Sequence, residues 1–152
     1  DIFCDNNDDI LSLHVRRNDK KREAKVYNWN DAGYKPMMDH FGLNNIFIAS
    51  DDTRIISTII KNKYNLIYNK YSISVINGEY IGTQRGSNNS LISVALDILL
   101  LSNGNIFIGQ DSSRVSSSIY QLISIKNQNY NNICASIDHY HKHKEIGWYW
   151  WI

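Results

Sequence analysis

The chain has 152 residues, of which 43% are hydrophobic and 20% are charged, and its formal net charge is +1. This composition predicts one globular domain and excludes a disordered chain. The near-neutral charge excludes the broad positive field of proteins that bind nucleic acid or anionic membranes, and no apolar run reaches the roughly 18 residues that span a bilayer. Any recognition of an anionic ligand must therefore be local.

The predicted elements begin with a strand over residues 10–15, ILSLHV, and a short helix over residues 34–41. The apolar run NIFIAS at residues 45–50 is typical of a buried parallel strand. Isoleucines at helical spacing predict a helix within DDTRIISTIIKNK, and YNLIY is the next strand candidate.

The second half continues the alternation with the helix SLISVALDILLLSN, for which Ser90 is a suitable N-cap, and the strand NIFIG at residues 105–109. The helix SSRVSSSIYQLISI and the strand NICASI follow. The tail DHYHKHKEIGWYWWI is expected to be an exposed strand or an irregular tail, although its histidines could bind a metal. Strands separated by helices predict an α/β fold, with a parallel, Rossmann-like sheet that carries helices on both faces.

Polar residues follow three of the predicted strands, at the carboxyl ends where α/β proteins bind ligands. They are Arg16 and Arg17 after the first strand, Asp51 and Asp52 after NIFIAS, and Ser112 and Ser113 after NIFIG. Arginine forks bind phosphate in a bidentate way, and a helix N-terminus with serine hydroxyls is a phosphate site. The pattern predicts a diphosphate held between the arginines and the serine turn. The alternatives are surface ion pairs for the arginines and helix caps for the serines and aspartates.

Asp97 lies in a predicted helix that is apolar nearly all round, and such a helix is expected to be buried. A carboxylate within it must be paired or protonated, because its desolvation otherwise costs several kcal/mol. Its partner is either structural, such as an arginine or backbone amides, or a ligand edge with two donors. The N1–H and N2–H₂ edge of guanine is one such edge.

Together, these segments resemble the donor-binding half of the α1,6-fucosyltransferases and, more distantly, the α1,2- and protein O-fucosyltransferases. The motifs LHVRRNDK, IASDD and NSLISVALDILLLSNGNIFIGQDSSRV occur in the family's order between about residues 10 and 122. The resemblance implies a GT-B-type architecture, in which two Rossmann-like domains face each other across a cleft. This chain would be the second domain, which holds GDP-fucose without a metal, and we expect it to be a fragment that lacks the acceptor-side domain.

The resemblance also implies roles for the matching residues of the donor site. His14 and Asp97 would contact guanine, while Arg16 and Ser113 would hold the diphosphate and Arg17 would support the pocket. Tyr34 matches a functionally important tyrosine, and Asp51 and Asp52 match an aspartate pair that shapes the site.

The expected catalytic pair is Lys20 with Glu23, which lies one residue closer to the lysine than the family pattern has it. Inverting transfer needs a base for the acceptor proton, for which Glu23 or Asp19 is suitable. It also needs a cation that stabilises the leaving diphosphate, which Arg16 can supply.

Gly109 and Ser116 stand where vertebrate-type members have a cysteine pair, and its absence favours the cytoplasm over the Golgi lumen. Cys4 and Cys134 are expected to be free thiols.

The preferred hypothesis is an enzyme that transfers fucose from GDP-fucose, with inversion, to the 6-OH of a GlcNAc in a glycan acceptor. The alternatives are a nucleotide-sugar binding module without turnover, an enzyme that resembles the protein O-fucosyltransferases, and a structural α/β domain whose aromatic tail docks a partner.

Overall fold

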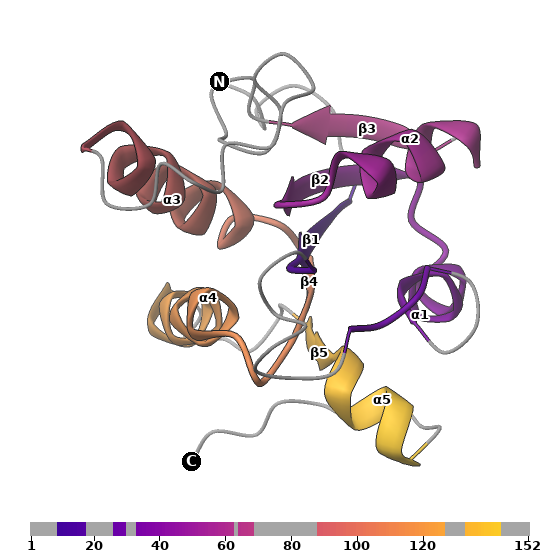
Figure 1. The fold of residues 1–152 in the computed structure, drawn as a ribbon. Coiled ribbons are helices and arrows are strands. Elements are labelled where there is room, and N and C mark those ends of the chain that lie inside the picture. The colour runs from indigo at the N-terminus through magenta and orange to yellow at the C-terminus, as the bar shows by residue number, and fades with distance from the viewer. Residues whose placement is uncertain are drawn as a thin grey trace.

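The computed structural model describes residues 9–17, 26–29, 33–62, 64–68, 88–126 and 133–143. Strands and helices alternate strictly along these residues, as Figure 1 shows. In chain order, the elements are β1 (Ile10–Val15), α1 (Tyr34–Phe41), β2 (Asn45–Ser50), α2 (Thr53–Lys61), β3 (Asn65–Tyr68), α3 (Asn88–Leu101), β4 (Ile106–Gly109), α4 (Arg114–Lys126), β5 (Ile133–Ser136) and α5 (Ile137–His143).

The strands form one parallel sheet in the order β3-β2-β1-β4-β5. Leu13 in β1 lies between Ile48 of β2 and Ile108 of β4, which fixes the register of the three central strands. β2 and β3 lie on one side of β1, and β4 and β5 lie on the other side. The boundary between β1 and β4 is therefore the switch point at which open α/β sheets bind ligands beyond the carboxyl ends of the strands.

Helices cover both faces of the sheet, so the predicted Rossmann-like α/β fold is confirmed (Figure 1). Side chains alternate between the faces along each strand. Ile48 and Ile108 pack with residues of α1, α2 and α5 on one face. Phe47 and Phe107 pack with residues of α3 and α4 on the other face. Because β1 pairs in parallel with β2 and with β4, the carboxyl ends of these three strands lie at one edge of the sheet.

The prediction that the helix around Asp97 is buried on all sides was wrong. The side chains of Leu91, Ile92 and Leu99 in α3 are 63%, 59% and 50% exposed, whereas Leu101 is fully buried. A helix that is apolar all round gives no signal for which side faces the sheet, and tertiary packing alone makes that choice. The helix also begins at Asn88, so Ser90 lies in its first turn and is not its N-cap.

The beginning of the histidine-rich tail was also mispredicted, because residues 137–143 form α5. Ser136 at the end of β5 accepts a hydrogen bond from the backbone N–H of His139, at 3.3 Å, as an N-cap residue does. Asp138 lies in the first helical turn, where a negative charge is favourable. A serine followed two residues later by an aspartate is a helix-start pattern that could have been recognised in the sequence. The aromatic end of the tail, residues 144–152, lies outside the described residues.

Two sequence expectations concern the cysteines and the bilayer. Cys134 is a free thiol, as expected, and burial raises its pKa to about 12. Cys4 lies outside the described residues. Among the helices that the structure describes, none combines the length and the apolar character that crossing a membrane requires.

Candidate functional site

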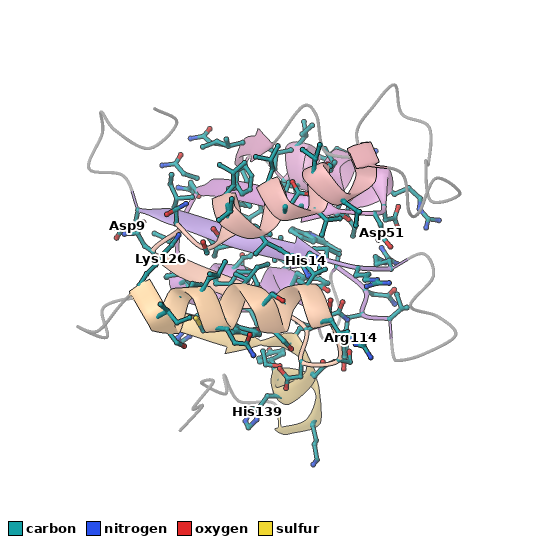
Figure 2. All side chains as sticks on the ribbon, turned by 90° about the vertical axis from the view of Figure 1, so that its left-hand side faces the viewer. Asp9, His14, Asp51, Arg114, Lys126 and His139 are labelled. Carbon is teal, nitrogen blue, oxygen red and sulfur yellow. The ribbon has the colours of Figure 1, made fainter. Side chains whose placement is uncertain are left out.

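Most of the predicted site residues that the structure describes lie where β1, β2 and β4 end, whereas Tyr34 lies in α1 and Asp97 in α3. Figure 2 shows His14, Asp51 and Arg114 toward one end of the strands and Asp9 and Lys126 toward the other. Arg16 and Arg17 directly follow β1, and the serine turn directly follows β4, its neighbour in the sheet. The fold therefore brings together polar residues that lie about a hundred positions apart in the sequence.

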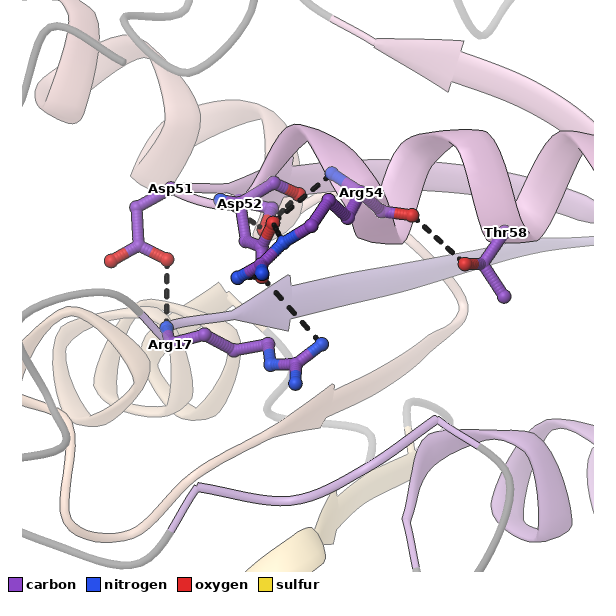
Figure 3. Close-up of polar contacts among 6 residues, drawn as sticks. Arg17, Asp51, Asp52, Arg54 and Thr58 are labelled. Atoms are coloured by element: carbon purple, nitrogen blue, oxygen red, sulfur yellow. Dashed lines mark hydrogen bonds and ion pairs between the residues drawn. The ribbon is translucent and has the colours of Figure 1, made fainter.

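The two aspartates after β2 bind the end of β1 and the start of α2 (Figure 3). Asp51 Oδ1 accepts a hydrogen bond from the backbone N–H of Arg17 at 2.7 Å. Asp52 is the N-cap of α2, and its carboxylate accepts hydrogen bonds from the backbone N–H, Nε and Nη2 of Arg54 at 3.0, 2.8 and 2.8 Å. Arg17 Nη1 lies 3.6 Å from Asp52 Oδ2. Asp51 and Asp52 thus hold Arg17, which follows β1, next to the end of β2.

The charges around Asp52 keep its carboxylate ionised. Burial alone would raise the pKa of Asp52, but hydrogen bonds from Arg54 and the positive charges of Arg54 and Arg17 outweigh burial and hold this pKa below its ordinary value. Arg17 Nε is itself buried and has no hydrogen-bond partner among the described residues. Arg17 is therefore held by its backbone and one Nη atom.

The serine turn is built by its own backbone and by a carboxylate from α5. The N–H of Ser113 donates to the carbonyl oxygen of Gln110 at 3.0 Å, and the N–H of Ser112 donates to Asp138 Oδ2 at 3.0 Å. Ser113 immediately precedes α4 and is fully buried, and its hydroxyl has no hydrogen-bond partner among the described residues. Of the two predicted phosphate ligands, Ser113 carries the stronger structural signal, because its hydroxyl is buried and lacks a hydrogen-bond partner among the described residues, whereas Ser112 is exposed.

His14 is held in a buried polar contact on the face of the sheet that α3 and α4 cover. Its Nδ1 atom lies 2.8 Å from Ser116 Oγ, and Ser116 Oγ also accepts the backbone N–H of Gln110 at 3.1 Å. His14 is 7% exposed and Ser116 is fully buried. Figure 2 shows His14 between α3 and α4. Sequence reasoning missed this role of Ser116, because a serine three residues into a helix pattern gives no sign of a partner on a distant strand.

Gln110 is a second residue that sequence reasoning missed. It follows β4 directly at the switch point and is fully buried. Neither atom of its side-chain amide has a hydrogen-bond partner among the described residues. Buried amides without partners are costly and mark positions where a ligand or water is expected. The sequence signal was available, since a polar residue closes an apolar strand at the predicted binding edge.

Asp97 lies on the inward side of α3, on the same helical stripe as the buried residues Ser93 and Leu101. These positions are four residues apart and therefore share one face of the helix. Asp97 is partly buried. The inward side of α3 thus carries a carboxylate among core residues such as Ile98 and Leu101, while large apolar side chains such as Leu91 are exposed on the other side. The role of Asp97 toward guanine stays a prediction.

A further polar group lies beneath the serine turn, around α5. Tyr27 donates its hydroxyl to Asp138 Oδ1 at 2.6 Å, and burial followed by this hydrogen bond raises the pKa of Tyr27. Ser136 donates to Asp111 Oδ1 at 2.7 Å, and burial raises the pKa of Asp111. Asp138 therefore joins the segment after β1 to the turn after β4.

Tyr34 opens α1 and is fully buried, stacked against Trp29 with ring centroids 6.4 Å apart. Its hydroxyl has no hydrogen-bond partner among the described residues, and burial raises its pKa. The predicted catalytic residues Lys20 and Glu23, together with Asp19, lie outside the described residues, so their roles stay predictions.

One comparison with known proteins identifies the family of this chain. The family model of alpha-(1,6)-fucosyltransferase N- and catalytic domains matches residues 5–141, a span that includes β1 to β5 and most of α5. No curated protein matches the chain. A match over most of the sequence shows the family, and the chain therefore belongs to the α-(1,6)-fucosyltransferase family as part of a fucosyltransferase catalytic domain.

Proposed function

We propose that this domain binds GDP-fucose and supports transfer of fucose, with inversion, to the 6-OH of a GlcNAc in a glycan. The observation that carries the proposal is the set of buried polar groups at the switch point between β1 and β4. His14, Gln110 and Ser113 are all at least nine-tenths buried, and they lie near the end of β1 or just after β4, which are neighbours in a parallel sheet. Such groups at this edge suit a nucleotide diphosphate.

Arg16 and Arg17 have different roles at this edge in the proposal. Arg17 is tied to Asp51 and Asp52, on the side of the sheet where α2 lies. Since side chains alternate along a strand, Arg16 is expected on the opposite side, with His14. Arg16 and the Ser113 hydroxyl would then hold the diphosphate, and Arg17 would keep the segment in place. An arginine there acts mainly as negative charge develops on the leaving phosphate.

The remaining roles follow the family resemblance. His14 and Asp97 would contact guanine, and Lys20 and Glu23 would form the catalytic pair that removes the acceptor proton. We propose that the donor is held without a metal, and that the glycan is bound by a second, acceptor-side domain. A binding module without turnover is the second candidate, because Glu23 lies one residue nearer to Lys20 than in the family pattern.

Calorimetric titration with GDP, GDP-fucose and UDP tests this proposal. We expect GDP and GDP-fucose to bind and UDP to bind much more weakly. Equal binding of UDP, or no binding of GDP, would contradict the assignment of the site. Transfer of radiolabelled fucose to a GlcNAc-containing glycan, assayed in the protein that carries both domains, then separates the enzyme from the binding module.

A further inference from the structure

We propose that Ser116 is a positioning residue for His14, whose ring it keeps in the tautomer with the proton on Nε2. The inference deepens the proposed function, because its consequence for the ligand requires that His14 contact the base. The tautomer itself is a property of the protein alone. Two hydrogen bonds to Ser116 Oγ, at 2.8 Å from His14 Nδ1 and 3.1 Å from the Gln110 backbone nitrogen, carry the argument.

The number of hydrogen bonds that Ser116 Oγ can donate and accept decides whether it donates to His14 Nδ1 or accepts from it. A serine hydroxyl has one hydrogen to donate and can accept two hydrogen bonds. The backbone N–H of Gln110 can only donate, so it uses one acceptor position of Ser116 Oγ. Within the described residues, His14 Nδ1 is the acceptor in contact with this hydroxyl.

The reverse direction leaves a buried donor unsatisfied. If Nδ1 carried the proton and donated to Ser116, the serine hydrogen would have no acceptor among the described residues, and Ser116 is fully buried. Leaving a buried donor without a partner costs more than the hydrogen bond is worth. Nδ1 is therefore the acceptor, and a neutral imidazole with an unprotonated Nδ1 carries its proton on Nε2.

The position of the Ser116 hydroxyl is set by rigid elements. Ser116 is the third residue of α4, and Gln110 directly follows β4. Gly109 provides the space, because a Cβ atom at this position would lie 2.8 Å from Ser116 Oγ. Gly109 and Ser116 thus face each other, at the two positions where the family resemblance places a cysteine pair. In this chain a glycine and a hydroxyl occupy that contact, and the hydroxyl is directed to His14.

The tautomer determines what His14 can recognise through Nε2. An N–H donor suits an acceptor atom, and guanine presents O6 and N7 as acceptors, whereas adenine presents an N6–H₂ donor where guanine has O6. A donor at His14 would complement a carboxylate at Asp97 that accepts from guanine N1–H and N2–H₂. Ser116 would then contribute to the preference for GDP over ADP without touching the nucleotide.

The tautomer can be measured directly by NMR in the protein labelled with ¹⁵N-histidine, without nucleotide and above the pKa of histidine. The His14 signals are assigned by their loss in His14→Gln. We expect an unprotonated, hydrogen-bonded Nδ1 and a protonated Nε2. In Ser116→Ala the ring should become a mixture of tautomers, whereas Ser116→Thr, which keeps the hydroxyl, should restore the wild-type pattern. Ser118→Ala in the same helix is the matched control and should change nothing.

Titration with GDP and ADP tests the consequence. Ser116→Ala should weaken GDP binding by about three- to tenfold and narrow the preference for GDP over ADP, while Ser118→Ala should leave both unchanged. A protonated Nδ1 in the wild type overturns the inference whether or not GDP binds, and this measurement needs no variant that might misfold. A wild type with the expected tautomer that does not bind GDP would contradict the proposed function and leave the role of Ser116 toward His14 intact.

Discussion

Arg16 and Arg17 are adjacent in the sequence, yet the fold gives them different surroundings. Arg17 is held through its backbone by Asp51 and through its side chain by Asp52. It is therefore mainly committed to supporting the site, as the family resemblance implies. Arg16 is partly buried at the same sheet edge, and it is the arginine that the proposed function assigns to the phosphate fork.

Arg16→Ala should weaken GDP binding by roughly 2–4 kcal/mol if the guanidinium is a desolvated phosphate fork. Arg16→Lys should restore only part of the affinity, because an ammonium group cannot reproduce the fork. Calorimetry with GDP measures both effects. Lys126→Ala is a suitable control, because Lys126 contacts Ser102 and Asn103 at the opposite end of the sheet. A loss below about 0.5 kcal/mol for Arg16→Ala would identify an ordinary surface arginine.

Asp97→Asn keeps the shape of the side chain but replaces one acceptor oxygen with a donor. Facing guanine N1–H or N2–H₂, that donor should lower GDP affinity by roughly 2–4 kcal/mol. Inosine diphosphate lacks the N2 amine, so the wild type should prefer GDP and the variant should lose part of this preference. Competition binding with the two nucleotides gives the ratio. Full retention of the preference, together with a lower thermal stability, would assign Asp97 a structural ion pair.

At the scale of the elements, the start of α2 depends on a charged cap. The Asp52 carboxylate accepts three hydrogen bonds from Arg54 and lies near the Arg17 guanidinium, and these contacts lower its pKa. A lowered pKa in the folded state means that the carboxylate stabilises the fold when it is charged. This contribution is complete at pH values above the ordinary value of 3.8 and is lost as the pH falls through the lower, folded-state value.

Asp52→Asn should therefore lower the free energy of unfolding at about pH 7 and flatten its fall in acid. Urea unfolding at several pH values measures both changes. Asp39→Asn is the control, because Asp39 forms an exposed ion pair with Lys35 in α1, and such pairs contribute little. Equal effects of the two substitutions would mean that the Asp52 cap contributes no more to the free energy of unfolding than an exposed ion pair does.

Substitutions on the buried side of α3 should lower the stability of the fold, whereas substitutions on its exposed side should change it little. Leu101→Ala removes a fully buried side chain and should cost about 2–5 kcal/mol of unfolding free energy. Leu99 is 50% exposed, so Leu99→Lys should change the stability by no more than about 0.5 kcal/mol. Chemical denaturation of both variants decides the point. A large loss for Leu99→Lys would show that the outward side of α3 is packed in solution.

At the scale of the whole molecule, the formal charge of +1 provides no long-range attraction for a diphosphate. The proposed function then requires affinity from short contacts at the edge of the sheet, where it assigns arginines, a helix N-terminus and a buried hydroxyl to the phosphates without a metal ion. GDP binding should therefore survive an excess of EDTA, and added Mg²⁺ should not increase it. Calorimetry in the two buffers measures this. Loss of binding in EDTA would require a metal site.

Much of this architecture follows from local sequence signals. The runs ILSLHV and NIFIAS coincide with β1 and β2, and the short helix over residues 34–41 coincides with α1. Apolar runs bounded by polar residues identify buried strands, because burial on both faces requires continuous apolar sequence. Alternation with helices then implies a parallel sheet and right-handed crossovers. The edge of the sheet near which Arg17, Asp51 and Ser113 lie could be predicted for the same reason.

Other features depend on which surfaces meet in three dimensions. The sequence of α3 is apolar all round, so only packing against the sheet selects the stripe of Ser93, Asp97 and Leu101 as the inward side. The contact between His14 and Ser116 joins residues 102 positions apart, and no local pattern encodes it. Propensity and periodicity act over one or two turns, whereas hydrogen bonds between elements depend on the strand order that places β1 beside β4. The sequence by itself determined the class of fold and the edge of the site, and the tertiary structure decided which side chains support one another there.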